Sequence, residues 1–169
     1  MIRAILPACC LIAACSLSFV PPSLAQGDGS ATNVLSVTAP AGVRLKAGST
    51  SEVTLKLSLR EGYHVNSNKP SDKYLIPLKL TWNPLFKEGP AESAEVVFPK
   101  PQFEKVSFSP NPLSVFTGQF ELVTRFKVPA TAMPGPAALI GKVRYQACND
   151  RMCLTPKNLD VAMQVDIVK

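Results

Sequence analysis

The sequence has few of the residues and motifs on which acid–base and nucleophilic catalysis usually depend. It has a single histidine, His64, among 169 residues. It has no Gly-x-Ser-x-Gly, no His-Glu-x-x-His and no glycine-rich phosphate loop. A Ser–His or Cys–His pair would have to use His64, and nothing in the sequence places that residue near a cysteine. The sequence therefore gives no support for a hydrolase.

Aromatic residues and clustered positive charge are also scarce. Phe, Trp and Tyr make up 7% of the chain, and the basic residues behind the net charge of +6 are scattered. Nucleic-acid sites usually gather their positive charge in a patch, so we interpret this charge as an ordinary solvated surface and expect no nucleic-acid partner. The 16 prolines argue against long helices. After the N-terminal segment, no apolar run approaches the length of a membrane-spanning helix.

The N-terminal segment has the pattern of a secretory signal peptide. A short basic start that ends at Arg3 is followed by a mostly apolar stretch from Ala4 to Val20. Ser23-Leu24-Ala25 then ends in a small residue, as signal-peptide cleavage sites do. We therefore expect residues 1–25 to be a signal peptide, and the protein to be periplasmic or otherwise exported.

A second interpretation of this segment is a lipoprotein signal. Ile12-Ala13-Ala14-Cys15 resembles a lipobox, in which the cysteine is lipidated after cleavage. The residues after Cys15 stay apolar, whereas a lipoprotein tether is usually polar, so we favour cleavage after Ala25. Membrane contact is expected only if Cys15 carries a lipid or if the protein docks on a membrane-bound reductase.

Cleavage after Ala25 would leave two of the five cysteines. Cys9, Cys10 and Cys15 lie in the signal segment, so Cys148 and Cys153 would be the only ones in the mature chain. An exported protein meets an oxidising compartment, in which paired cysteines can form disulfides.

Alternation of apolar and polar residues dominates the chain after Asn33. This period of two predicts β-strands, and no helical period is visible. Residues 26–33 are rich in Gly, Ser and Asp and are expected to be a flexible leader. About eight strands are predicted, at residues 34–38, 43–46, 53–60, 76–82, 94–98, 120–128, 139–147 and 159–167, with a break at Glu61-Gly62 after which residues 63–66 would continue the third strand past a bulge. We therefore predict an all-β domain over residues 34–169, an immunoglobulin-like antiparallel β-sandwich.

The connection between the strands predicted at 94–98 and 120–128 is long and punctuated by prolines. Long connections without regular structure are usually functional or disordered. This one contains Phe103, Val106 and Phe108, and three apolar side chains argue against simple disorder.

Cys148 and Cys153 lie between the last two predicted strands and are separated by four residues. Asn149-Asp150 favours a turn, which can bring two Cα atoms within the about 4.4–6.8 Å that a disulfide needs. So small a ring would add only roughly 2 kcal/mol of stability. Arg151 favours a thiolate and Asp150 opposes one. The spacing is therefore equally compatible with a structural staple and with a redox centre.

Metal binding is a third interpretation. The two cysteines, Met152 between them and His64 elsewhere are ligands that suit a soft ion such as Cu(I). A closed zinc site usually needs four ligands, and at most three are found here. We therefore expect no metal and no other cofactor.

The stretch around these cysteines resembles the N-terminal periplasmic domain of the thiol–disulfide reductase DsbD. The resemblance lies in Val143-Arg144-Tyr145-Gln146-Ala147-Cys148 and in Cys153-Leu154-Thr155-Pro156, and Glu61-Gly62-Tyr63-His64 is similar to the family's Gly-aromatic stretch. It implies an immunoglobulin-like sandwich and a thiol–disulfide oxidoreductase that carries reducing equivalents through a reversible disulfide. The implied partners are thioredoxin-like proteins and periplasmic disulfide proteins.

The resemblance also implies roles for particular residues. Cys148 and Cys153 would form the reversible disulfide, and Cys153 would bond the partner. A family cap loop covers the disulfide with an aromatic side chain, a part that Phe103 or Phe108 would play here. Tyr63, His64 and Tyr145 are candidates for lining the site.

Three departures from the family pattern keep a second hypothesis open. The family's best-known spacing has five residues between the cysteines rather than four, and family tyrosines are replaced around His64 and Asn66. The chain also ends after the predicted sandwich, which suggests a free-standing carrier fed by other proteins, or a descendant with a changed role. The alternative is a non-catalytic binding module whose disulfide only shapes a loop.

Overall fold

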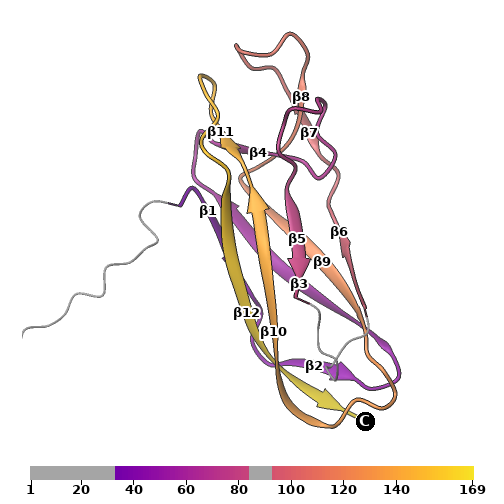
Figure 1. Cartoon of the computed structure of the whole chain (residues 1–169). Coiled ribbons are helices and arrows are strands. Elements are labelled where there is room, and N and C mark those ends of the chain that lie inside the picture. Colours follow the sequence, from indigo (N-terminus) through magenta and orange to yellow (C-terminus); the bar gives the residue numbers. More distant parts are fainter. Residues whose placement is uncertain (1–32, 84–92) are drawn as a thin grey trace, which may run out of the picture.

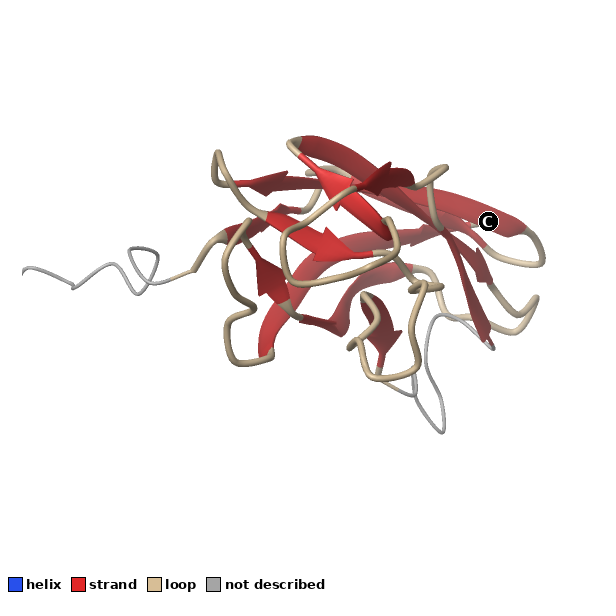
Figure 2. Cartoon of the chain, turned by 90° about the horizontal axis from the view of Figure 1, so that it is seen from above, coloured by secondary structure: helices blue, strands red, loops and turns tan. Residues whose placement is uncertain are grey.

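The structure is a computed structural model that describes residues 33–83 and 93–169, and these residues contain strands, turns and loops but no helix (Figure 2). The expected signal peptide at 1–25, the lipobox cysteine and residues 26–32 of the expected leader lie outside the described residues, as does the segment at 84–92. Within the described ranges, no helix is long and apolar enough to cross a membrane.

Sheet A has four antiparallel strands in the order β1-β3-β9-β6. They are β1 (Leu35–Thr38), β3 (Thr50–Leu59), β9 (Gln119–Lys127) and β6 (Ser93–Val97). In β3, four buried residues alternate with polar ones: Val53, Leu55, Leu57 and Leu59. The alternation that predicted this strand therefore turns one face to the core and one toward solvent.

Sheet B has four strands in the order β2-β12-β10-β5. They are β2 (Val43–Lys46), β12 (Lys157–Val168), β10 (Gly135–Tyr145) and β5 (Lys79–Trp82). The sequence predicted an antiparallel sandwich, but β2 pairs with β12 in parallel, so sheet B is mixed. Gly42, with a φ of 66°, lies in the turn that takes the chain from β1 in sheet A to β2 at the edge of sheet B. This crossing between sheets lets β2 run in the same direction as β12.

The core lies between sheets A and B (Figure 1). Trp82 from β5 donates its indole N–H to Oγ1 of Thr124 in β9 at 3.1 Å, and it packs edge-on against Phe126 with the ring centroids 5.1 Å apart. Gly141 in β10 faces this indole, and a Cβ atom there would lie 2.8 Å from Trp82 Cε3. The two sheets are therefore joined by close packing around one indole.

Sheet C is a small sheet of four short strands in the order β11-β4-β8-β7. They are β11 (Ala147–Cys148), β4 (His64–Asn66), β8 (Leu113–Thr117) and β7 (Gln102–Glu104). Figure 1 shows them together at the end of the sandwich away from the C-terminus. β10 runs into β11 across a single residue, Gln146, and β8 runs into β9 through Gly118, which has a φ of 58°. The long strands of both main sheets therefore fix where sheet C lies.

The predicted all-β sandwich is confirmed, but the described residues form twelve strands rather than about eight. β7 and β11 have three and two residues, too few for an alternating pattern to be visible. In β8, Leu113 to Phe116 are all buried, so this strand has no polar face. The connection after residue 98 was expected to lack regular structure, which is wrong because it contains β7. A strand covered on both faces loses the period of two.

Candidate functional site

The two predicted cysteines form a disulfide in a tight hairpin that continues β11. The Sγ atoms are 2.03 Å apart, and Cys148 and Cys153 face one another as an antiparallel pair. Their Cα atoms are 3.9 Å apart, shorter than the about 4.4–6.8 Å expected from the sequence. Two backbone hydrogen bonds close the hairpin, from Asn149 N to Met152 O at 2.9 Å and from Leu154 N to Ala147 O at 2.8 Å.

The turn between the cysteines is stabilised by the side chain that predicted it. Oδ1 of Asn149 accepts hydrogen bonds from the backbone N–H groups of Arg151 at 2.9 Å and Met152 at 3.0 Å. This is the local side-chain-to-backbone bonding that makes Asn a turn residue. The hairpin therefore does not depend on the disulfide alone for its shape.

The two cysteines differ in their exposure. Cys148 is 0% exposed, whereas Cys153 is only partly buried and follows the exposed Met152. Thiol–disulfide exchange requires access of a thiolate to one sulfur. A partner approaching from solvent therefore reaches Cys153 before Cys148.

His64 is the direct cross-strand partner of Cys148. The register of β4 and β11 places the two Cα positions opposite one another, and the paired residues of β4 and β8 place Thr117 opposite His64 on the other side. Directly paired residues project to the same face of a sheet, with Cβ atoms about 4.5–5.5 Å apart. The histidine therefore lies beside the buried cysteine, where the family resemblance but no spacing in the sequence had suggested it.

Glu104, in the edge strand β7 of sheet C, contacts the imidazole ring of His64. Its Oε2 is 3.4 Å from Nδ1 of His64, and the histidine is only 3% exposed. Burial lowers the pKa of His64, and the carboxylates of Glu104 and Asp150 partly oppose that shift. With its proton on Nδ1, beside the Glu104 carboxylate, a neutral imidazole keeps Nε2 as an acceptor. Among the described residues, Nε2 of His64 is buried without a hydrogen-bond partner.

The connection between β7 and β8 packs against part of the face of sheet C that carries His64 and Cys148. Val106 from this connection packs with Leu113 and Val115 of β8 in a small apolar cluster, against which Leu75 also packs. Register places Val115 and Leu113 on the same face as His64. The long proline-punctuated connection therefore packs over the part of this face formed by Leu113 and Val115, and we call residues 105–112 the cover loop.

One hydrogen bond joins the cover loop to the disulfide hairpin. The hydroxyl of Ser107 donates to the backbone oxygen of Asp150 at 2.6 Å. Asp150 lies in the turn between the two cysteines, so this bond connects the loop directly to the segment that carries the disulfide.

A family model described as thiol:disulfide interchange protein DsbD, N-terminal, matches residues 31–164. The chain belongs to this family. The resemblance seen in the sequence is therefore confirmed over most of the chain. No curated protein matches the chain.

Solved structures show the same fold. The N-terminal periplasmic domain of ScsB from Proteus mirabilis is similar with a TM-score of 0.51 and 13% sequence identity, over 78% of this chain and 45% of that one. This chain therefore spans less than half of the ScsB structure that it matches, and at this identity the likeness concerns the fold alone. A PapD-like domain of human CEP192 matches over 94% of this chain and 99% of that one at 12% identity, with a TM-score of 0.35 that carries no argument.

The two candidate cap residues of this DsbD-family domain lie at different places. Phe103 is 70% exposed and is paired with Ser114, so it projects from the face of β7 opposite to Glu104. Phe108 is 41% exposed and lies in the cover loop, next to Ser107. Of the two, only Phe108 belongs to the loop that is bonded to the hairpin, and its role as a cap stays a prediction.

Tyr63 and Tyr145, the two tyrosines proposed to line the site, pack with the main core. Tyr145 is 1% exposed within the core between sheets A and B, and burial raises its pKa. Tyr63 is half-buried and packs against the same core. The structure brings His64 to the disulfide and places these two phenol side chains in the sandwich core.

Glu104, Val106 and Ser107 are site residues for which sequence reasoning proposed no role. The only available signal was their position in a long connection with apolar residues, which marks a segment as functional but does not show what it covers. In the described part of the chain, no three His, Cys, Asp or Glu residues are grouped as metal ligands would be.

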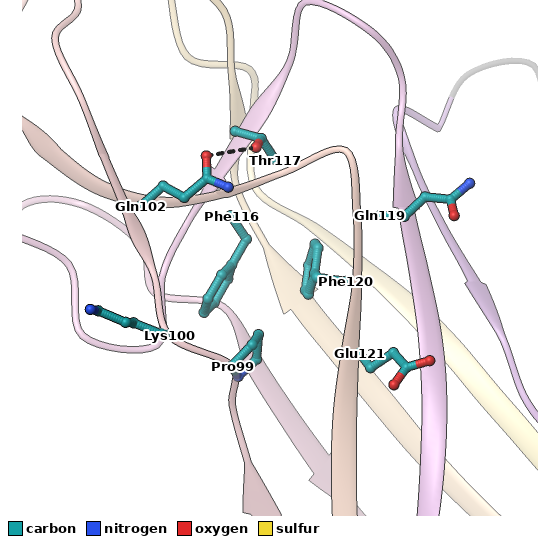
Figure 3. A pocket seen from close by; sticks show the side chains of 8 residues that line it. All are labelled: Pro99, Lys100, Gln102, Phe116, Thr117, Gln119, Phe120 and Glu121. Carbon is teal, nitrogen blue, oxygen red and sulfur yellow. Dashed lines mark hydrogen bonds between the residues drawn. The ribbon is translucent and has the colours of Figure 1, made fainter.

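An open pocket of about 380 Å³ lies on the flank of the molecule, between the β6–β7 connection and the β8–β9 turn (Figure 3). Phe116 and Phe120 stack within it with ring centroids 4.9 Å apart, and Oγ1 of Thr117 donates to Oε1 of Gln102 at 3.2 Å. Neither cysteine lines this pocket, nor do His64 and Glu104.

Proposed function

We propose that the protein is an exported, periplasmic thiol–disulfide exchange protein that carries reducing equivalents through Cys148 and Cys153. The observation that carries the proposal is the unequal exposure of a disulfide in a chain of the DsbD N-terminal family. Cys153 is partly exposed at the end of the sandwich, whereas Cys148 is fully buried. Such a pair offers one sulfur to a partner and shields the other.

The exchange runs in two displacements. A thiolate of the reducing partner attacks Sγ of Cys153, forming a mixed disulfide, and the electron pair of the broken sulfur–sulfur bond leaves on Sγ of Cys148. The partner's second thiolate then attacks the partner sulfur that is bonded to Cys153, and Cys153 leaves as a thiolate. The partner is oxidised to a disulfide, the carrier is reduced by two electrons, and both carrier thiolates take up protons. Delivery to an oxidised protein reverses these steps.

The fold does not rely on the disulfide alone. The two backbone hydrogen bonds of the hairpin and the Asn149 turn bonds involve no sulfur atom, so opening the disulfide removes none of them directly. The core between sheets A and B has no disulfide of its own in the described residues. A carrier must be stable in both redox states, and this arrangement supports that requirement.

The proposed partners are thioredoxin-like proteins as electron donors and periplasmic disulfide proteins as acceptors. Family membership supports this assignment. The exposed side chain of Met152, next to Cys153, offers an adaptable apolar contact for such partners.

A mixed-disulfide trap tests the proposal. A Cys148→Ser variant, expressed with its own export signal, leaves Cys153 free to hold a partner, so we expect covalent adducts that dissolve on reduction. The matched Cys153→Ser variant leaves only the buried Cys148 and should form few adducts. If neither variant forms adducts and a Cys148→Ser/Cys153→Ser double variant complements fully in the cell, exchange is not the function and the disulfide only shapes a loop.

A further inference from the structure

The buried ring nitrogen beside Cys148 is the most unusual feature of the site that disulfide exchange alone leaves unexplained. His64 is 3% exposed, and its Nε2 atom has no hydrogen-bond partner among the described residues. Buried polar atoms in proteins are nearly always hydrogen-bonded, so an unpartnered one at a reactive site calls for an explanation. The reduced protein differs from this state because Cys148 carries a thiol there.

The geometry of sheet C fixes which ring nitrogen is available. Glu104 lies 3.4 Å from Nδ1 and therefore holds the Nδ1–H tautomer in place. His64 and Cys148 are direct partners in the register of β4 and β11, so their side chains share one face of the sheet. The remaining nitrogen, Nε2, is consequently the acceptor on a ring placed beside Cys148.

We propose that His64, oriented by Glu104, accepts the proton of the Cys148 thiol when the reduced carrier delivers its electrons. This inference rests on the exchange function proposed above and assigns the proton transfer within it. The charged groups that act on His64 are Glu104 from β7 and Asp150 from the hairpin, while Cys148 and Thr117 flank it on β11 and β8. Both carboxylates favour the imidazolium that the transfer creates.

The proposed step balances as follows. Cys153 has already formed a mixed disulfide with an oxidised protein. The Cys148 thiol gives its proton to Nε2, and its thiolate attacks Sγ of Cys153. The Cys148–Cys153 bond forms, the bond between Cys153 and the acceptor breaks, and the electron pair leaves on the acceptor sulfur. The acceptor is reduced, the carrier is oxidised, and the proton on His64 passes to the departing thiolate or to solvent.

A base is needed at this position because Cys148 is fully buried. Burial in apolar surroundings disfavours a thiolate, and the thiolate is the reactive form. Cys153 is partly exposed and can ionise into solvent. Only the buried member of the pair requires a proton acceptor within the protein.

The test follows a single turnover of the reduced protein with one equivalent of dithiobis(nitrobenzoate). Cys153 reacts first and releases one nitrothiobenzoate, and attack by Cys148 then releases the second. We expect the second phase in the wild type to keep its rate down to the pKa of His64 and to fall below it, where the protonated ring cannot accept a proton. In His64→Gln we expect it to slow about tenfold at neutral pH and to gain a steeper rise toward alkaline pH. Glu104→Gln should shift the profile in the same direction by less.

A matched control removes the same charge elsewhere. Glu95 pairs with Arg125 on sheet A at 3.7 Å, so Glu95→Gln should leave the pH profile of the second phase unchanged. A profile that is equal in wild type, His64→Gln and Glu104→Gln overturns the proposal. Should His64→Gln fail to fold, nitrogen chemical shifts of His64 in the wild type decide instead. A proton acquired at Nε2 as the reduced protein ionises supports the transfer, and identical titration of the oxidised and reduced forms refutes it.

The outcome is separable from that of the carrier function. A disulfide too stable to exchange with protein partners, combined with a His64-dependent second phase, refutes the carrier function and leaves the proton transfer in place. Efficient exchange with partners and a pH profile indifferent to His64 refutes the proton transfer alone.

Discussion

Reduction of the Cys148–Cys153 disulfide should cost little stability, and the structure allows the loss to be estimated. The bond closes a ring between residues separated by 5 positions in the sequence. The chain-entropy model gives roughly 2 kcal/mol for a ring of this size. The backbone hydrogen bonds of the hairpin and the Asn149 turn bonds involve no sulfur atom, so we expect them to remain on reduction and to add no further loss.

The assay compares urea unfolding of the oxidised and reduced protein at one pH. We expect the free energy of unfolding to fall by about 2 kcal/mol with the urea dependence unchanged, and the melting temperature to fall by roughly 6–10 °C. The reduced protein should keep its far-ultraviolet spectrum. A Cys148→Ser/Cys153→Ser variant in the presence of reductant gives the matched reference.

Two results would refute this reasoning. A loss above about 5 kcal/mol, or unfolding on reduction, would mean that the disulfide is a structural staple, because removing a native disulfide from a dependent domain costs about that much. A protein that unfolds when reduced also cannot carry electrons. No loss at all would mean that the hairpin ring does not constrain the unfolded chain.

Three further predictions concern the cover loop, the core and His64. Ser107→Ala removes the 2.6 Å hydrogen bond to the Asp150 carbonyl and should speed reduction of the disulfide by dithiothreitol about 2–10-fold, whereas Ser109→Ala, which loses a bond to Asn111 within the loop, should not. Gly141→Ala places a Cβ atom 2.8 Å from Trp82 and should cost about 1–3 kcal/mol in urea unfolding, which an unchanged midpoint would contradict. Burial lowers the pKa of His64 in the folded protein below its ordinary 6.5. Just below pH 6.5 the unfolded chain therefore binds more protons than the folded protein, so the oxidised protein should lose stability as the pH falls below 6.5. His64→Gln should lose less stability than the wild type between pH 7.5 and 5.5, and equal losses would contradict the assignment.

Much of the sandwich was predictable from the sequence because the long strands have one buried and one exposed face. The alternation in β3 and in β12 appears in the residues themselves, since polar positions face solvent. Sheet C was not predictable in the same way. β11 has two residues, and β8 is buried on both faces, so neither carries a period of two.

The two cysteines were also predictable, but the neighbourhood of Cys148 was not. Proximity of His64 depends on which residue of β4 lies opposite Cys148, and register between strands so far apart in the sequence is set by the whole sandwich. Glu104 reaches His64 only because β7 adds to the edge of β8 with a particular pairing. The family resemblance made His64 a candidate for lining the site, but nothing in the sequence indicated its pairing with Cys148 or its contact with Glu104.

The measurement that tests the central claim most directly is the reduction potential of the Cys148–Cys153 pair. It is obtained by equilibrating the purified protein with glutathione or dithiothreitol couples and quantifying the free thiols. We predict a potential above about −300 mV, in the range in which disulfides exchange with thioredoxin-like proteins. A potential well below that value would contradict the account and would identify the disulfide as a structural bond.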